Sequence, residues 1–170
     1  MSKDKNLDGL YELIDDIEIA MLTTRRSDGR LVSRPMATQE REDDADLWFV
    51  ANIDSHKMDE LEHDPHVNVA YYDGDSFEWV SVSGTARISQ DRERIRELWA
   101  PDWRAWFGKE DDVRDGSADD PRLALIYVDA DSVTYKKNDK PRPLMLFEVA
   151  KGIITGSEPD VGEVRQVDMK

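Results

Sequence analysis

The sequence predicts a mainly β protein, an antiparallel β-barrel with helices at its ends. Short segments rich in β-branched and aromatic residues recur along the 170-residue chain. Most of them are joined by short turn signals typical of hairpins, and helical spacing is confined to a few segments between and beside them. We therefore expect a barrel rather than a doubly wound parallel sheet. One domain is expected over residues 1–156, followed by a loose tail over 157–170 with few anchors.

The N-terminal half combines two helices with three strands. Pro35 lacks a backbone donor and is expected on a sheet edge, at a bulge or beside a ligand. The strand that ends at Ala51 leads through a polar turn into a helix, for which Asp54 or Ser55 is a fitting N-cap. The expected elements are a helix over 7–17, strands over 18–25, 30–38 and 47–51, and a helix over 55–63.

The C-terminal half adds three strands and further helices. Gly84 interrupts a long strand pattern, which indicates a bulge or the close approach of another backbone. Gly, Asp and Ser dominate the segment that ends at Pro121, so a long mobile loop is expected there. The expected elements are strands over 66–73, 77–88 and 122–135, a helix over 91–99, an aromatic segment over 99–108, and a short C-terminal helix ended by Gly156.

Composition excludes several classes of function. The chain has no cysteine, which removes disulfides, thiolate catalysis and iron–sulfur clusters. Its net charge of −15 makes nucleic acids and anionic membranes poor partners. We expect a cytoplasmic protein without a membrane span, because no apolar run is long enough and the N-terminus is too acidic for a signal peptide. The three histidines follow no metal-ligand pattern, so no metal site is expected.

A possible anion site lies where the strand over 47–51 passes into a helix. The helix start carries Ser55 and Lys57, and Arg34 precedes the break at Pro35. These three side chains could converge on one phosphate, with the positive end of the helix dipole beside them. The alternative is an ordinary capped helix with an exposed lysine, and sequence alone leaves both open.

An aromatic cluster follows the third helical segment. Its flat side chains could cover a planar ring, pack in the core or form a subunit interface. The cluster consists of Trp99, Trp103, Trp106 and Phe107. The sequence contains neither glycine-rich nucleotide fingerprint and no hydrolase motif, and it identifies no catalytic acid or base.

Six motifs in the same order resemble the general stress protein 26 family. That family belongs to the flavin-binding split barrels related to pyridoxamine 5'-phosphate oxidase. The motifs are RPM at 34–36, LWFVANIDSHKMDEL at 47–61, DPHVNVAYYD at 64–73, WVSVSGTARI at 79–88, ELWAPDWRAWF at 97–107 and DPRLALIYVDADSVTY at 120–135. The similarity extends over roughly residues 7–156.

The resemblance implies a six-stranded antiparallel split β-barrel and a homodimer that binds FMN, or FAD, between its subunits. It implies phosphate contacts from Arg34, Ser55 and Lys57. The implied ring contacts come from Met36, from Phe49, Val50 and Ala51 largely through their backbone, and from Trp106 and Phe107, which reach the partner's flavin. The sequence departs from the family in an acidic insertion, Lys109–Asp119, and in Lys136, where relatives commonly have Trp.

The resemblance therefore implies a cytoplasmic, homodimeric flavin-binding protein. We expect a flavin-dependent oxidoreductase with a role in stress or redox response, with the substrate and electron donor unspecified. A non-enzymatic flavin carrier or sensor is the alternative, followed by a flavin-free structural dimer. A deazaflavin or haem ligand is a further split-barrel possibility.

Overall fold

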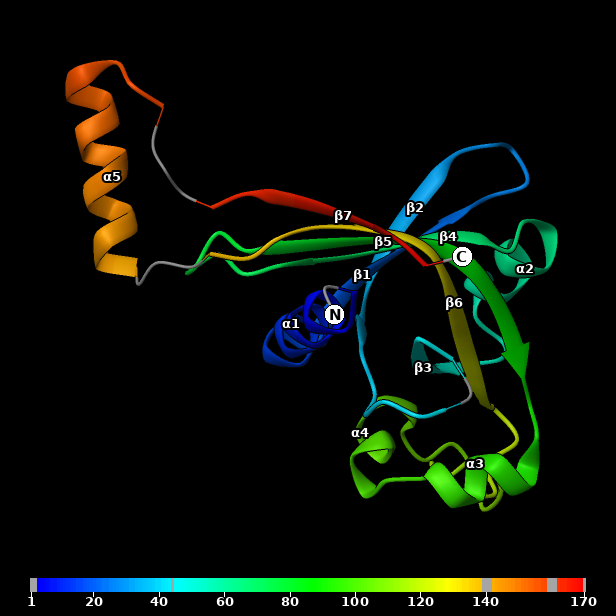
Figure 1. Ribbon diagram of the computed structural model, residues 1–170. Helices are drawn as coiled ribbons and strands as arrows, with labels where there is room; N and C mark the ends of the chain where they lie inside the picture. The colour runs from blue at the N-terminus through cyan, green and yellow to red at the C-terminus, as the bar shows by residue number, and fades with distance from the viewer. Residues whose placement is uncertain (1–2, 44, 139–141, 159–161, 170) are drawn as a thin grey trace.

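The computed structural model describes residues 3–43, 45–138, 142–158 and 162–169. Its strands are β1 Ile19–Arg25, β2 Leu31–Ala37, β3 Leu47–Asn52, β4 His66–Tyr72, β5 Trp79–Ser89, β6 Leu123–Lys136 and β7 Val164–Asp168. Its helices are α1 Lys3–Ile17, α2 His56–His63, α3 Arg92–Leu98, the short 3-10 helix η1 Pro101–Trp103, α4 Arg104–Phe107 and α5 Arg142–Thr155. The strands form one curled antiparallel sheet in the order β2-β1-β4-β5-β6-β3, with β7 added beside β6 (Figure 1). The predicted mainly β, antiparallel split-barrel class is confirmed.

Alternating burial along the strands builds the main core. In β1, Ala20, Leu22 and Thr24 are fully buried, whereas Ile19 and Met21 on the other side of the strand are exposed. This two-residue period directs one side of the sheet inward. The expected N-terminal helix is present as α1, and its Leu13 and Ile14 pack in the same core.

A second, smaller core lies under α3, η1 and α4. Residues 123–128 of β6 are all buried, because one side of the strand faces the main core and the other faces this second cluster. Trp48, Trp103 and Tyr127 are its largest members. The aromatic segment of the sequence therefore contributes partly to packing.

The barrel is split between β2 and β3, the two ends of the strand order. In the described part of the chain no ladder joins them, although the backbone N–H of Gln39 donates to the carbonyl of Trp48 at 3.2 Å. Pro35 lies on edge strand β2, as the sequence predicts, and pairs with Met21 of β1. The edges of two strands thus face one opening.

Gly84 marks the bulge that the sequence predicts. The register between β5 and β6 shifts between Ser83 and Gly84. A Cβ atom at Gly84 would collide with the backbone carbonyl oxygen of Asp129. Only glycine permits this close approach, and the bulge bends both strands where the sheet curls.

The expectation of a loose tail is corrected, because the tail contains β7. Residues Val164–Asp168 pair with the second half of β6, and the backbone N–H of Met169 donates to the carbonyl of Asp131 at 3.0 Å. The physical reason is the length of β6: β3 covers only its first half, which leaves a second edge open to pairing. The expected end of α5 is correct, since Gly156 follows it with a φ of 67°.

Candidate functional site

Two adjoining hollows lie at the split. The larger, of about 710 Å³, is lined by Arg26, Ser27, Val32, Arg34, Ser55, His56, Lys57, Asp59 and Glu60. The smaller, of about 280 Å³, is lined by Ile19, Pro35, Met36, Ala37, Gln39, Val50, Ala51, Asn52, Lys57, Asp102, Trp103, Trp106 and Phe107. Lys57 lines both of them. The sequence-predicted phosphate residues therefore share the larger hollow, and most of the predicted ring residues share the smaller one.

Ser55 and Lys57 are held together at the start of α2. Ser55 occupies the N-cap position, but its hydroxyl is turned back and donates to the carbonyl of Asn52 at 2.6 Å. The Lys57 Nζ atom donates to the Ser55 Oγ atom at 2.9 Å. The positive end of the helix dipole adds to the lysine charge at this point. The strand-to-helix junction thus supplies a hydroxyl and a cation to one hollow.

Arg34 is fixed by a partly buried network that the sequence did not reveal. Its guanidinium donates to the Thr24 Oγ1 atom at 2.6 Å and to the Glu60 Oε2 atom at 2.7 Å. Thr24 is fully buried and donates to the same Glu60 oxygen at 2.5 Å. Burial favours the neutral form of Glu60, but hydrogen bonds from Thr24 and Arg34 outweigh it and lower the pKa of Glu60. A guanidinium has five N–H donors, so Arg34 keeps donors for an anion while its direction is fixed.

The larger hollow is cationic in a strongly acidic protein. Its lining has three cations, Arg26, Arg34 and Lys57, against two carboxylates, Asp59 and Glu60, whereas the chain carries a net charge of −15. Partial burial lowers the pKa of Lys57, and repulsion from Arg34 lowers it further, with Glu60 acting in the opposite direction. An anion beside these two cations would be stabilised by both, as phosphate is.

The smaller hollow has flat and apolar walls. Met36 of β2, Val50 of β3 and Trp106 of α4 all line it, and Trp106 has 79% of its surface exposed. Trp103 is buried and donates its Nε1 hydrogen to the Gln39 Oε1 atom at 3.0 Å. Such walls suit a planar ring with polar atoms at its edge.

Phe49 is the one predicted ring residue that does not line the smaller hollow. Its side chain is fully buried in the main core, whereas that of its neighbour Val50 packs with the second cluster and lines the smaller hollow. Successive strand residues point to opposite sides, which explains the difference. A contact from Phe49 to a ring through its backbone stays a prediction.

Several residues of the site were missed by sequence reasoning. Gln39 and Asn52 line the smaller hollow, while Thr24 and Glu60 orient Arg34. Thr24 and Glu60 lie 36 positions apart on different elements, so no local motif joins them. Trp103 belongs to the aromatic cluster of the sequence, but its place in the wall of the smaller hollow follows only from the fold.

Arg122 fastens the aromatic wall to the sheet. Its guanidinium carbon lies 5.7 Å from the centre of the Phe107 ring, and its guanidinium donates to the Gly108 carbonyl at 2.9 Å. The same guanidinium contacts Asp120 at 2.7 Å and Glu110 at 2.8 Å. Both Asp120 and Arg122 are buried. The loop is long, as the sequence predicts, but Arg122, Arg92 and Trp99 hold it at several points, so the expectation of a mobile loop is corrected to an anchored one.

The Asp120 carboxylate makes stability depend on pH. Burial opposes its ionisation, but hydrogen bonds from Arg122 and from the Gly116 backbone lower its pKa to about 2. The pKa of an aspartate in an unfolded chain is about 3.9. The Asp120 carboxylate therefore stabilises the folded protein above that pH, and this stabilisation is lost as the pH falls toward 2. Urea unfolding of the wild type and Asp120→Asn should give a free-energy difference that shrinks below about pH 4. A difference that stays constant down to pH 2 would contradict this assignment.

The comparisons with known proteins agree with this architecture. The model of the family described as "Pyridoxamine 5'-phosphate oxidase like" matches residues 5–160. Protein bli-3 of Neurospora crassa is 36% identical over 167 residues, covering 96% of this chain and 80% of that protein. The structure of general stress protein 26 from Jannaschia sp. CCS1 matches with a TM-score of 0.72 at 25% identity, over 97% of this chain and 99% of the other.

A further solved relative comes from a plant pathogen. The general stress FMN/FAD binding protein of Xanthomonas citri matches with a TM-score of 0.63 at 26% identity, over 79% of this chain and 89% of the other. The family match spans both hollows and every strand from β1 to β6. The chain belongs to the pyridoxamine 5'-phosphate oxidase-like family.

Proposed function

We propose that this protein binds FMN, with FAD as the second candidate, across the two hollows. The observation that carries the proposal is their junction: a cationic hollow and an aromatic one meet at Lys57. A flavin mononucleotide has the matching parts, a phosphate joined to a planar ring system by a short chain. The name of the Xanthomonas citri relative, an FMN/FAD binding protein, supports the same ligand class.

The chain's own residues divide between the two ends of the ligand. Arg34, Ser55 and Lys57 would hold the phosphate, with Arg34 oriented by Glu60. Met36, Val50 and Ala51 would flank the ring, with Trp106 and Phe107 at its rim. β3 is the last strand of its path, so its backbone has an edge free of the β6 ladder that can meet polar ring atoms.

The outer side of the sheet supports a homodimer. Residues paired across β2, β1, β4, β5 and the second half of β6 share this side. They are Ile19, Met21, Thr23, Ser33, Pro35, Ala37, Asn68, Ala70, Tyr72, Trp79, Ser81, Ser83, Ser132, Thr134 and Lys136. We call this set the outer face. None of these fifteen is acidic, in a chain with 38 acidic residues, and charge depletion is typical of interface cores. Acidic residues border the set on the same side of the sheet: Asp168 of β7 pairs with Ser132, and Asp129 of β6 pairs with Thr85.

The outer face continues into the smaller hollow. Ile19, Pro35 and Ala37 belong to the face and also line the hollow. A second copy packed here would cover the ring site of the first, and symmetry would make the contact reciprocal. Binding and assembly are therefore coupled in this proposal.

Met21→Glu tests the dimer directly. Met21 lies on the outer face with 41% of its surface exposed, and a buried carboxylate there would be unpaired in both copies. We expect sedimentation equilibrium to give twice the 19.6 kDa chain mass for the wild type and the single-chain mass for Met21→Glu. Val113→Glu is the matched control, because Val113 is 65% exposed and lies in the acidic insertion. A Met21→Glu protein that remains dimeric would overturn this choice of face.

We further propose a flavin-dependent oxidoreductase of the cytoplasm. A bound flavin supplies hydride or electron transfer, and the protein supplies position, polarity and access. The test is to incubate the purified protein with FMN, remove free ligand by desalting, and record the visible flavin absorption. Retained absorption, bleached by NAD(P)H and restored by an electron acceptor, supports the enzyme. Absorption that is retained but not cycled supports a carrier or sensor, and a colourless protein overturns the flavin assignment.

A further inference from the structure

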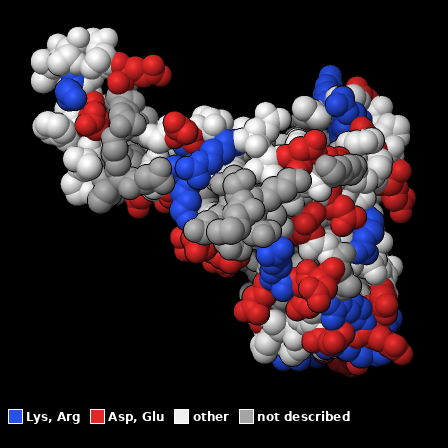
Figure 2. All heavy atoms as spheres, viewed as in Figure 1, with Lys and Arg blue, Asp and Glu red and all other residues white. Residues whose placement is uncertain are grey.

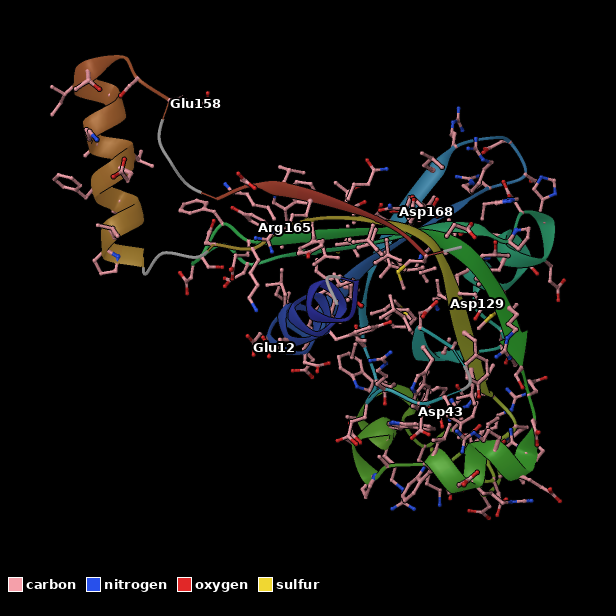
Figure 3. All side chains as sticks on the ribbon, in the orientation of Figure 1. Glu12, Asp43, Asp129, Glu158, Arg165 and Asp168 are labelled. Carbon is pink, nitrogen blue, oxygen red and sulfur yellow. The ribbon has the colours of Figure 1, made fainter. Side chains whose placement is uncertain are left out.

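Helix α5 stands away from the sheet with its apolar side chains uncovered. Figure 1 shows it beyond the end of β6 and β7, and Figure 3 shows its side chains extending into open space. Six of its large apolar residues are exposed over the following fractions of their surface: Leu144 46%, Leu146 53%, Phe147 62%, Val149 41%, Ile153 80% and Ile154 84%. Exposed apolar groups at this density mark an interaction surface.

Five of the six exposed residues form one broad stripe along the helix, whereas Leu144 lies on the other side. Leu146, Val149 and Ile153 are spaced by three and four residues and form one row along the helix. Phe147 and Ile154 are seven residues apart and form a second row beside the first. Glu148 and Lys151 lie on the opposite side, where the Lys151 Nζ atom is 3.9 Å from the Glu148 Oε2 atom. Figure 2 shows this lobe as largely uncharged, next to a body dense in charge. An exposed apolar stripe of this kind is typical of a helix that packs against another surface.

A lipid surface is a poor occupant for the stripe. Fourteen residues make a helix of about 21 Å, against a hydrocarbon core of about 30 Å, so α5 is too short to cross a membrane, and a lipid contact would have to be made with the helix lying flat. No helix in the described part of the chain is long and apolar enough to cross a membrane. The net charge of −15 also repels anionic headgroups. A protein surface without carboxylates fits better.

We infer that α5 is an arm that packs its apolar stripe on a second copy of this chain. The inference rests on the proposed homodimer. Two copies of charge −15 repel each other except through neutral surfaces, and the stripe and the outer face are both free of acidic side chains. Lys136, the last residue of β6, belongs to the outer face, so the arm leaves the sheet at the edge of that face.

The area that a stable dimer needs supports the same partner. Five strands of about seven residues present a flat face of about 550 Å², given spacings of about 4.8 Å between strands and 3.3 Å along them. The stripe of α5 adds about 200 Å², from a helix about 10 Å wide. Standard interfaces bury about 800 Å² on each partner. The face alone falls well short, and the arm supplies a large part of the difference.

Cross-linking between differently tagged chains tests the arm. The chain has no cysteine, so Ile153→Cys gives a single attachment point for a benzophenone maleimide. This variant carries one tag, is co-expressed with the wild-type chain carrying another, and the two-tag species is isolated and irradiated. We expect a covalent product of about twice the chain mass that contains both tags. Lys151→Cys, on the polar side of the same helix, is the matched control and should give several-fold less product.

The outcomes separate the arm from the dimer and from the flavin. A two-tag species that forms while Ile153→Cys reacts only within its own chain overturns the arm and leaves the dimer standing. Failure to obtain any two-tag species overturns both. Flavin absorption after desalting, measured on the same samples, reports the proposed function independently.

A second pair of variants measures the strength of the arm contact. Ile153→Asp should raise the dimer dissociation constant at least about 10-fold, because it places a charge in an apolar contact. Thr155→Asp adds the same charge on the polar side of the helix and should change the dimer dissociation constant less than about 2-fold. Equal effects of the two substitutions would contradict the arm.

Discussion

Replacing Lys57 with alanine is expected to weaken FMN binding about 100-fold. A hydrogen bond to a charged group contributes about 1.5–3 kcal/mol, and about 1.4 kcal/mol corresponds to a factor of ten. Lys57 is half-buried, close to the Ser55 hydroxyl, and lines both hollows. Quenching of FMN fluorescence on titration with protein gives the dissociation constant.

Arg34→Ala should weaken FMN binding by more than Lys57→Ala. It removes a phosphate donor and also leaves the Glu60 carboxylate without its arginine, facing the phosphate site. Arg26→Ala is the matched control: Arg26 lines the same hollow, but its side chain is 49% exposed and pairs with Asp28. If Arg26→Ala weakened binding as strongly as the other two, the phosphate would lie farther out than we place it.

Replacing Arg122 with methionine is expected to lower the free energy of unfolding by about 3–5 kcal/mol. Removing one partner of a buried ion pair leaves an uncompensated charge, and Asp120 is fully buried. The substitution also removes the donor to Gly108 and the contact with Phe107. Urea unfolding followed by tryptophan fluorescence measures the loss.

Two controls separate this ion pair from a general effect of charge. Arg114→Met removes a half-exposed arginine that pairs with the same Glu110, and should change stability by no more than about 0.5 kcal/mol. Combining Arg122→Met with Asp120→Asn should recover part of the stability, because the orphaned charge is gone. A double variant less stable than Arg122→Met alone would show that the stability lost in Arg122→Met does not come mainly from the unpaired Asp120 carboxylate.

The sequence predicts the β architecture well because its signals are local. The alternation in β1 and β4, the edge position of Pro35 and the bulge at Gly84 each follow from a few neighbouring residues. The same holds for Asp91, the first residue of the predicted helix over 91–99, which is the N-cap of α3: its carboxylate accepts from the backbone N–H groups of Glu93 and Arg94. In each case backbone geometry limits which residue can stand there.

Features that depend on distant partners could not be predicted. β7 forms because the far half of β6 has an open edge, which its own five residues do not reveal. The acidic insertion is ordered by Arg122, and Arg34 is oriented by Thr24 and Glu60. The sequence therefore indicates Arg34, Ser55 and Lys57 as anion ligands, but it does not reveal the groups that hold the arginine in place.

The most direct test of the site is to titrate the wild-type protein with FMN and with riboflavin, which lacks the phosphate. If the phosphate binds at Arg34 and Lys57 while the ring occupies the adjoining hollow, FMN should bind at least about 100-fold more tightly. Addition of inorganic phosphate should compete with FMN and leave riboflavin unaffected. Equal affinity for the two flavins, or quenching by neither, would contradict a phosphate site at Arg34 and Lys57.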